Sequence, residues 1–279
     1  FLGLPAVLLS CGGGGGGASG GSSSFFVSPH GVEALSAGEV TDVVARAVQA
    51  SLDRNQLSTI AVTDRVGNVL AIYQMTNAAP NATITSGLNP GAVAGLDGFT
   101  VPSTLAAIAK AITGAYLSST GNAFTTRTAS QIVQEFFQPG EIGQPSGPLY
   151  GVQFSQLPCS DLNLWLSQHP TIGPKRSPLG LSADPGGFPI YKNGRVVGGI
   201  GVISSSANNV NGIYGLDRNI QNVETDLDEE IAYAALPSAL RPPESIQANQ
   251  ILVNGQSFQF SNSTPGTAAA ANVNTQGAF

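Results

Sequence analysis

Two stretches of this chain are strand–turn–strand patterns, and they restrict the fold more than any other sequence feature. The runs 188–191 and 196–203 flank Asn193-Gly194, and Asn-Gly is the dipeptide that tight hairpin turns favour. The β-rich runs 57–63 and 68–75 are likewise joined by a short turn. Strands joined in this way pair antiparallel, because a parallel pair needs a long crossover connection. The sequence therefore predicts an antiparallel sheet and not a doubly wound parallel one.

Helical patterns lie before, between and after these hairpins. Ser36-Ala-Gly-Glu39 fits a capping box, and the apolar spacing that follows predicts a helix over 36–54. Further helices are predicted from about residue 103 to 115, over about 128–137 and over 226–235, and a small third hairpin over 250–260. This order predicts an α/β fold of the α+β kind, in which helices cover an antiparallel sheet.

Low-complexity segments flank one predicted domain. We expect a leader and Gly/Ser tether over 1–24, a single domain over 25–260, and a polar tail without core residues over 261–279. The stretches 76–102 and 138–187 are rich in Pro, Gly and Asn and show no sustained periodicity. They are predicted to be two long loop insertions, which are uncommon unless they serve a function.

Charge and composition exclude several classes of protein. Charged residues make up 10% of the chain against a usual value of about 25%. Lys+Arg 11 and Asp+Glu 17 give a net charge of −6 and a pI of about 4.8, so we expect no nucleic-acid partner. Two cysteines and two histidines exclude a disulfide framework, a four-thiolate site and a multi-histidine metal centre.

The first residues have the pattern of a processed leader. Leu8-Leu9-Ser10-Cys11 resembles the bacterial lipobox, in which the leader is removed and the Cys is lipidated. The chain begins at Phe1 without Met, so we expect a truncated leader. The following Gly, Ala and Ser residues would form a flexible tether. This predicts an extracellular or cell-envelope protein anchored to a membrane through Cys11; the alternative is a buried strand before a glycine loop.

An ordered set of short blocks carries a resemblance to a known family. These blocks are Ile60-Ala-Val-Thr-Asp64 with Gly67-Asn-Val-Leu-Ala71, Ala109-Lys-Ala-Ile-Thr113, Pro185-Gly-Gly-Phe-Pro-Ile190 with Asn193-Gly-Arg-Val-Val-Gly-Gly-Ile-Gly-Val202, and Asp228-Glu-Glu-Ile-Ala232. Together they resemble the GlcG/HbpS haem-binding family, whose relatives include the carboxy-terminal domain of the cobalamin-pathway protein PduO. The resemblance covers about residues 35–236.

This resemblance implies a compact α/β domain of profilin-like appearance that self-associates into symmetric oligomers. It also implies binding of haem or related tetrapyrroles, in a sensory or haem-handling role, without a well-established common catalytic activity. The two insertions, the lipobox and the carboxy-terminal hairpin with its tail depart from the family pattern.

Two residues on the predicted second helix match the family's lysine–threonine pair. Lys110 and Thr113 lie one turn apart on one helical face. A positive charge there would pair with a haem propionate or a substrate carboxylate. The alternative is a surface lysine beside a threonine that bonds back to the helix backbone.

Glycines in the matched blocks indicate close approach of another group. Glycine inside a strand marks a bulge or a place where a ligand or another backbone comes near. We therefore predict a ligand-facing or subunit-facing role for Gly186, Gly187, Gly198, Gly199 and Gly201. The last three do not form a dinucleotide fingerprint, because they lie inside a strand and not at a strand-to-helix turn.

Haem iron takes an axial donor from His, Met, Cys or Tyr, and the chain offers few of them. The candidates are His169, Tyr191 and Met75, with His30 and Cys159 as weaker ones. The alternatives are a solvated histidine, a packed strand tyrosine, a core methionine and a buried thiol. Apolar contacts and propionate pairing would also hold haem without a strong protein ligand.

An oxygen-rich cluster is the candidate for calcium. It consists of Asp217, Asn219, Asp226 and Asp228, but the glycine and spacing of an EF-hand are missing. The alternative is a solvated loop followed by a helix start. No Gly-x-Ser-x-Gly elbow supports a hydrolase.

The sequence leaves three candidate functions. The first is an extracytoplasmic haem-binding protein with a binding, sensing or haem-handling role. The second is a structural or assembly subunit that uses the same fold without haem and contacts its neighbours through the insertions. The third is an enzyme that acts on a small carboxylate. Only Lys110, which lies in a matched block, supports this third function.

Overall fold

The computed structural model describes residues 33–85, 98–133, 179–206, 211–215, 226–253 and 255–273. Its contacts divide the chain into two units, Phe1–Val32 and Glu33–Phe279, and the described residues lie in the second.

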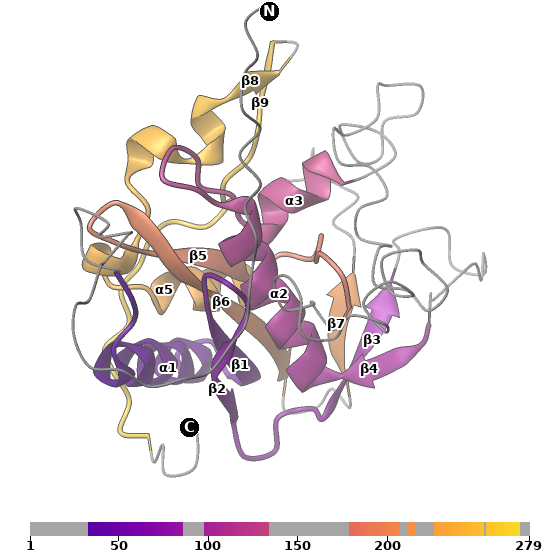
Figure 1. The fold of residues 1–279 in the computed structure, drawn as a ribbon. Helices are drawn as coiled ribbons and strands as arrows, with labels where there is room; N and C mark the ends of the chain where they lie inside the picture. The colour runs from indigo at the N-terminus through magenta and orange to yellow at the C-terminus, as the bar shows by residue number, and fades with distance from the viewer. Residues whose placement is uncertain are drawn as a thin grey trace, which may run out of the picture. The chain divides into compact units, whose positions relative to one another are not determined.

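The centre of this unit is a four-stranded antiparallel sheet with the strand order β2-β1-β6-β5 (Figure 1). Its strands are β1 (Gln56–Asp64), β2 (Val69–Gln74), β5 (Gly187–Lys192) and β6 (Arg195–Ser206). The predicted antiparallel sheet and its two hairpins are therefore confirmed.

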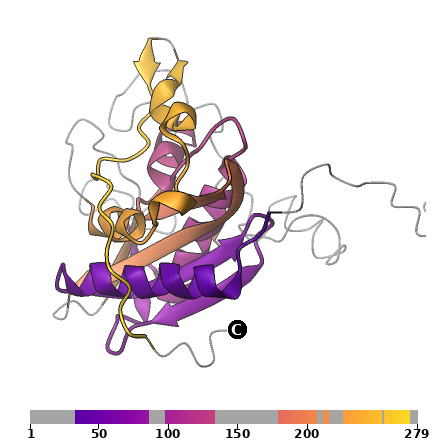
Figure 2. The same cartoon turned by 90° about the vertical axis from the view of Figure 1, so that its left-hand side faces the viewer.

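Helices cover both faces of this sheet. One face packs against α1 (Ala37–Leu52) and α5 (Leu227–Ala234), and the other against α2 (Ser103–Leu117) (Figures 1 and 2). The predicted capping box opens α1, where the Glu39 carboxylate accepts a 2.8 Å hydrogen bond from the Ser36 amide. None of the described helices has the length and apolar character needed to cross a bilayer.

The two faces of the sheet carry side chains of different size, because strand residues alternate between faces. Ile60 and Val62 of β1 and Ile200 and Val202 of β6 belong to the larger core beneath α1 and α5. The face beneath α2 carries Ala61 and glycines at its centre, with Ile203 and the partly buried Ile72 beside them. The sheet therefore has a conventional apolar core on one side and a close backbone contact on the other.

A second, three-stranded sheet has the order β4-β3-β7. It consists of β3 (Asn81–Thr85), β4 (Thr100–Pro102) and β7 (Gly212–Gly215), with β3 and β7 parallel. The prediction of an uninterrupted loop over 76–102 is wrong at both of its ends. Short Thr- and Asn-containing strands show little apolar alternation, and they are stabilised here by their partners and by the fully buried Ala82.

Other boundaries differ by a few residues. Helix α3 spans Thr126–Ile132 and is capped by Thr125, so it begins two residues before the predicted start. Three 3-10 turns at Ser238–Leu240, Glu244–Ile246 and Ala248–Gln250 lead to the short strands β8 (Leu252–Val253) and β9 (Gln256–Ser257). Most of the predicted insertion 138–187, as far as residue 178, lies outside the described residues.

The carboxy-terminal segment 258–273, which we call the strap, packs against the domain. Phe258 and Phe260 are buried, and Ala268 and Ala271 pack against the core. The Ala268 amide donates to the Ala234 carbonyl of α5 and the Ala271 amide to the Ala45 carbonyl of α1, each at 3.1 Å. The prediction of a tail without core residues is therefore wrong, because alanines and backbone groups make contacts that no apolar periodicity reveals.

Candidate functional site

The glycines of β6 admit the backbone of α2. A Cβ atom at Gly199 would collide with the Ala111 carbonyl oxygen, and one at Gly201 with that of Ala107. A Cβ at Gly187 would meet the Lys110 carbonyl oxygen in the same way. The close approach predicted from the sequence is thus present, but the approaching group is a helix of the same chain. The side-chain positions of these three glycines leave no room for a ligand.

The other two glycines of the matched blocks are also enclosed. A Cβ at Gly198 would collide with the Thr63 carbonyl oxygen, on the strand that pairs with it. Gly186 has φ +111°, a conformation that favours glycine, and a Cβ there would lie 2.6 Å from Cβ of Asp228. Both positions serve the packing of the chain itself.

Lys110 belongs to this contact, and its side chain is fully buried. Its Nζ is 2.5 Å from Oδ2 of Asp184 and 2.6 Å from Oδ2 of Asp228. An unpaired charge would be costly at such a position, and the two carboxylates compensate the charge of the buried lysine. Lys110 is therefore neither a surface lysine nor a free cation for a propionate or substrate carboxylate.

The remaining oxygens of this cluster are held by backbone amides. Oδ1 of Asp228 accepts a 2.7 Å hydrogen bond from the Ser204 amide, and Oδ1 of Asp184 accepts one of 3.0 Å from the Gly215 amide. The cluster therefore joins α2, α5, β6 and β7 with the segment that precedes β5. We call Lys110, Asp184, Asp226 and Asp228 the buried ion cluster.

The environment of the cluster shifts the pKa of its members. Burial raises the pKa of Asp184 to about 6, and burial together with the nearby Asp228 charge raises the pKa of Asp226 to about 8. Burial alone would lower the pKa of Lys110, but the charges of Asp184 and Asp228 outweigh it and hold the pKa above its ordinary value. The cluster therefore keeps a carboxyl proton near neutral pH.

Thr113 links the neighbouring segment to α2. Its hydroxyl donates to the Ala109 carbonyl at 2.7 Å and accepts from the Ser182 amide at 2.8 Å. Thr113 therefore bonds back to the backbone of its own helix, which is the alternative that the sequence left open. Thr126 adds a similar contact, because its hydroxyl accepts from the Gly187 amide at 2.9 Å.

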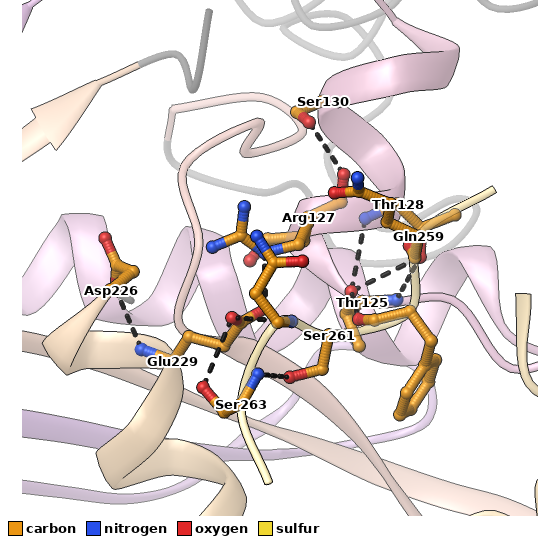
Figure 3. Close-up of polar contacts among 12 residues, drawn as sticks. Thr125, Arg127, Thr128, Ser130, Asp226, Glu229, Gln259, Ser261 and Ser263 are labelled. Atoms are coloured by element: carbon orange, nitrogen blue, oxygen red, sulfur yellow. Dashed lines mark hydrogen bonds and ion pairs between the residues drawn. The ribbon is translucent and has the colours of Figure 1, made fainter. Parts of the chain in front are cut away.

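A second buried ion pair fixes the strap (Figure 3). Nε of Arg127 donates to Oε1 of Glu229 at 2.8 Å, and both side chains are almost fully buried. Oε2 of Glu229 accepts from the Asn262 amide and from the Ser263 hydroxyl. The Thr125 hydroxyl also donates to the strap, at the Phe260 carbonyl. The sequence indicated neither this pair nor its partners, because they come from three distant segments.

Of the predicted axial donors, the structure describes Met75 and Tyr191, and both make other contacts. Sδ of Met75 accepts a hydrogen bond from the Ser58 amide, and the side chain is buried. The Tyr191 hydroxyl donates to the Ser119 carbonyl at 2.6 Å, and the residue is 1% exposed. Burial raises the pKa of Tyr191 to about 12, which disfavours the tyrosinate that iron would need. His169, His30, Cys159 and Cys11 lie outside the described residues.

The calcium candidates form no complete site in the described ranges. Asp217 and Asn219 lie outside these ranges. Asp226 caps α5 by accepting from the Glu229 amide, and both oxygens of Asp228 are bound by Lys110 and Ser204. Among the described residues, no group of three or more His, Cys, Asp or Glu side chains is arranged to hold a metal ion.

An open groove of about 470 Å³ lies at the carboxy-terminal end of α2. Its lining includes Val66, Ala115, Val196, Tyr116 and Arg65. The Tyr116 hydroxyl donates to the Val66 carbonyl at 3.0 Å and so ties the β1–β2 turn to α2. Arg65 is exposed and has no ion pair with any described residue. Sequence reasoning missed this groove, because its residues come from three separate elements.

The β1–β2 turn that carries Arg65 is held in shape by its own hydrogen bonds. Oδ1 of Asp64 accepts from the Val66 and Asn68 amides, and Oδ2 accepts from the Asn68 side chain. The Asp64 carboxylate is thus engaged within the turn. The groove therefore combines apolar and aromatic side chains with the hydroxyl-bearing Ser118, Ser119 and Thr120 and with a cation on a fixed turn, which suits an anionic ligand with an apolar body.

Comparison with known proteins found similar solved structures at low sequence identity. No family model and no curated protein matches the chain. A crystal structure of a PduOC–haem complex is similar to 73% of this chain and 93% of its own, with 18% identity and a TM-score of 0.40. Protein ORFY of Klebsiella pneumoniae matches over 76% of this chain and 94% of its own, with 19% identity and a TM-score of 0.41.

A double mutant of Streptomyces reticuli HbpS is also similar to this chain. The match covers 78% of this chain and 95% of that one, with 19% identity and a TM-score of 0.37.

Proposed function

We propose that this chain is a binding protein for haem or a related tetrapyrrole, with a binding, sensing or haem-handling role. The observation that carries the proposal is the open groove at the end of α2, which offers apolar side chains beside the exposed cation of Arg65. Its volume of about 470 Å³ lies in the range of small-molecule sites, roughly 300–1,000 Å³. The ordered sequence blocks that resemble the haem-binding family support the same ligand.

The groove residues fit a haem that is held without one of the predicted axial donors. Val66, Ala115 and Val196 would contact the apolar macrocycle, and Arg65 would pair with a propionate. The Tyr116 phenol also lines the groove, but it donates to the Val66 carbonyl and burial raises its pKa, so apolar contacts and propionate pairing would hold the haem. Bound haem would supply the redox and ligand chemistry of its iron, while the protein sets its orientation and exposure.

The buried ion cluster argues against an enzyme that uses Lys110 on a small carboxylate. Two carboxylates already neutralise this lysine, and its side chain has no exposed surface. The structural or assembly alternative stays open beside haem binding. Symmetric self-association, which the family resemblance implies, belongs to both proposals.

Haemin titration of the full chain tests the proposed function. We expect a Soret band to appear and to saturate, and Arg65→Gln to weaken haemin binding, because it removes the cation that would pair with a propionate. Met75→Leu is the matched control and should leave the band unchanged, because Met75 is buried outside the groove lining. The absence of any spectral change would overturn haem binding. If light scattering then found large assemblies, the structural alternative would replace it.

We further propose that the protein is extracytoplasmic and anchored to a membrane through Cys11. Support comes from the lipobox-like Leu8-Leu9-Ser10-Cys11 and from the Gly/Ser tether after it. Bacterial cells expressing the chain behind a complete leader should incorporate labelled fatty acid into the protein, and Cys11→Ala should abolish the label. Equal labelling of both proteins, or labelling of neither, would contradict the anchor.

A further inference from the structure

The two carboxylates of the buried ion cluster contact Lys110 in different ways. Oδ2 of Asp228 accepts a regular hydrogen bond from Nζ at 2.6 Å. Oδ2 of Asp184 lies nearer, at 2.5 Å, but this contact does not have hydrogen-bond geometry, and the oxygen is buried without any hydrogen bond. Of the two carboxyl groups, Asp184 is thus the one whose oxygen lies closest to Nζ and has no other partner.

This contact lies in a closely packed and almost fully buried part of the domain. The Lys110 side chain is fully buried, and that of Asp184 is 10% exposed. The backbone of α2 around Lys110 is held in place by Gly187 and Gly201, where no side chain fits between helix and strand. An amine and a carboxyl group are therefore fixed in contact where ionisation is costly and water does not compete.

From this arrangement we propose that Lys110 and Asp184 condense into an intramolecular isopeptide bond, with Asp228 as the proton carrier. The bond would be an amide between Nζ of Lys110 and Cγ of Asp184. It would replace the buried Lys110–Asp184 ion pair by a neutral amide, whose N–H can still donate to the Asp228 carboxylate.

The step balances without any co-reactant. A proton passes from the Lys110 ammonium to the Asp184 carboxylate, which leaves a neutral amine and a carboxylic acid. The lone pair of Nζ attacks Cγ, and Asp228 takes a second proton from the nitrogen and returns it to the departing hydroxyl. The bond from Cγ to that oxygen breaks, one water molecule leaves, and Asp228 is a carboxylate again.

Asp184 is the acceptor and Asp228 the carrier for two reasons. Both oxygens of Asp228 are engaged in well-formed hydrogen bonds, whereas Oδ2 of Asp184 has none. Burial also raises the pKa of Asp184 to about 6, which eases the first proton transfer. Since both charges raise the pKa of Lys110, that transfer is uphill, and the bond should form slowly after folding.

Intact-mass spectrometry of the folded full chain tests the bond. We expect a species about 18 Da lighter than the sequence mass, the loss of one water, which increases with time after folding. Tandem spectra should place the loss on a branched peptide that joins Lys110 to Asp184. A succinimide, the common source of this mass loss, cannot form at Asp184, because the next residue is Pro185 and its nitrogen carries no hydrogen.

Matched variants separate the bond from a structural ion pair. Asp184→Asn should lose ammonia, about 17 Da, in place of water, because the asparagine side chain then releases its nitrogen as ammonia. Asp228→Asn should keep the bond from forming or slow its formation severalfold, and Lys110→Arg should keep the sequence mass. Circular dichroism reports whether each variant is folded. A natively folded full chain that keeps its sequence mass on long incubation overturns the proposal, as does a mass loss that maps to other residues.

Discussion

Single glycines determine how closely α2 lies on the sheet, so replacing one of them should lower the stability of the fold. Gly199→Ala places a methyl group against the Ala111 carbonyl oxygen, and backbone cannot move aside as a side chain does. We expect the free energy of unfolding to fall by about 1–3 kcal/mol in urea denaturation.

Gly38→Ala is the control for this substitution. Gly38 lies in α1, and a methyl group added there would have no atom within 4 Å, so stability should stay unchanged or rise by up to about 1 kcal/mol. Equal effects of the two substitutions would show that α2 does not need the glycine.

At this scale the sequence identifies the glycines but not what approaches them. A glycine inside a strand predicts a close neighbour, and here the neighbour is the α2 backbone. Lys110 stood in a matched block, yet its partners Asp184 and Asp228 are far along the chain, and no spacing rule connects them. The sequence does not indicate Arg65 or Tyr116 for the same reason. The groove forms only when the β1–β2 turn, α2 and β6 come together in the folded chain.

Among the larger elements, the strap is the one whose contribution to stability is most easily tested. Phe260 stacks edge-on against Phe188 and Tyr233, with ring centroids 5.8 Å and 6.2 Å apart. We expect Phe260→Ala to lower the free energy of unfolding by about 3–5 kcal/mol, because the cavity lies between β5, α5 and the strap. Denaturation monitored by circular dichroism measures this loss.

Leu252→Ala is the matched control for the strap. Leu252 is 70% exposed on the hairpin just before the strap, so its removal should change stability by less than about 0.5 kcal/mol. A small effect of Phe260→Ala would instead mean that the strap adds little to the fold.

The elements with strong local signals were predictable, and those with long-range partners were not. The capping box at Ser36 and the Asn193-Gly194 turn each specify their element within a few residues. Strands β3 and β7 are held by pairing with each other across more than a hundred residues, and the strap by side chains from α3 and α5. Such partners appear only in the folded chain.

For the whole molecule, the buried ion cluster predicts how stability depends on pH. The pKa of Asp226 is raised from 3.8 to about 8, so the folded state keeps a proton that the unfolded chain has already lost. Stability should therefore fall as pH rises from about 4 toward 8 and level off above that, since the unfolded state binds fewer protons in this window. Asp184, raised to about 6, acts in the same direction.

Urea denaturation between pH about 5 and 8 checks this dependence. Asp226→Asn should flatten it while keeping the cap of α5, because Asn accepts the same amide hydrogen bond. Asp53→Asn, at an exposed carboxylate, controls for the loss of one charge. An unchanged slope in Asp226→Asn would mean that another group is responsible.

The contrast between the two faces of the sheet affects how this protein tolerates change. Toward α1 and α5, one branched aliphatic residue such as Ile200 can be exchanged for another of similar volume. Toward α2, no residue larger than glycine fits at Gly199 or Gly201. Between residues 199 and 202, substitutions should thus be rejected at the two glycines and accepted at the two aliphatic residues, while Gly198 is restricted by the Thr63 carbonyl of its partner strand.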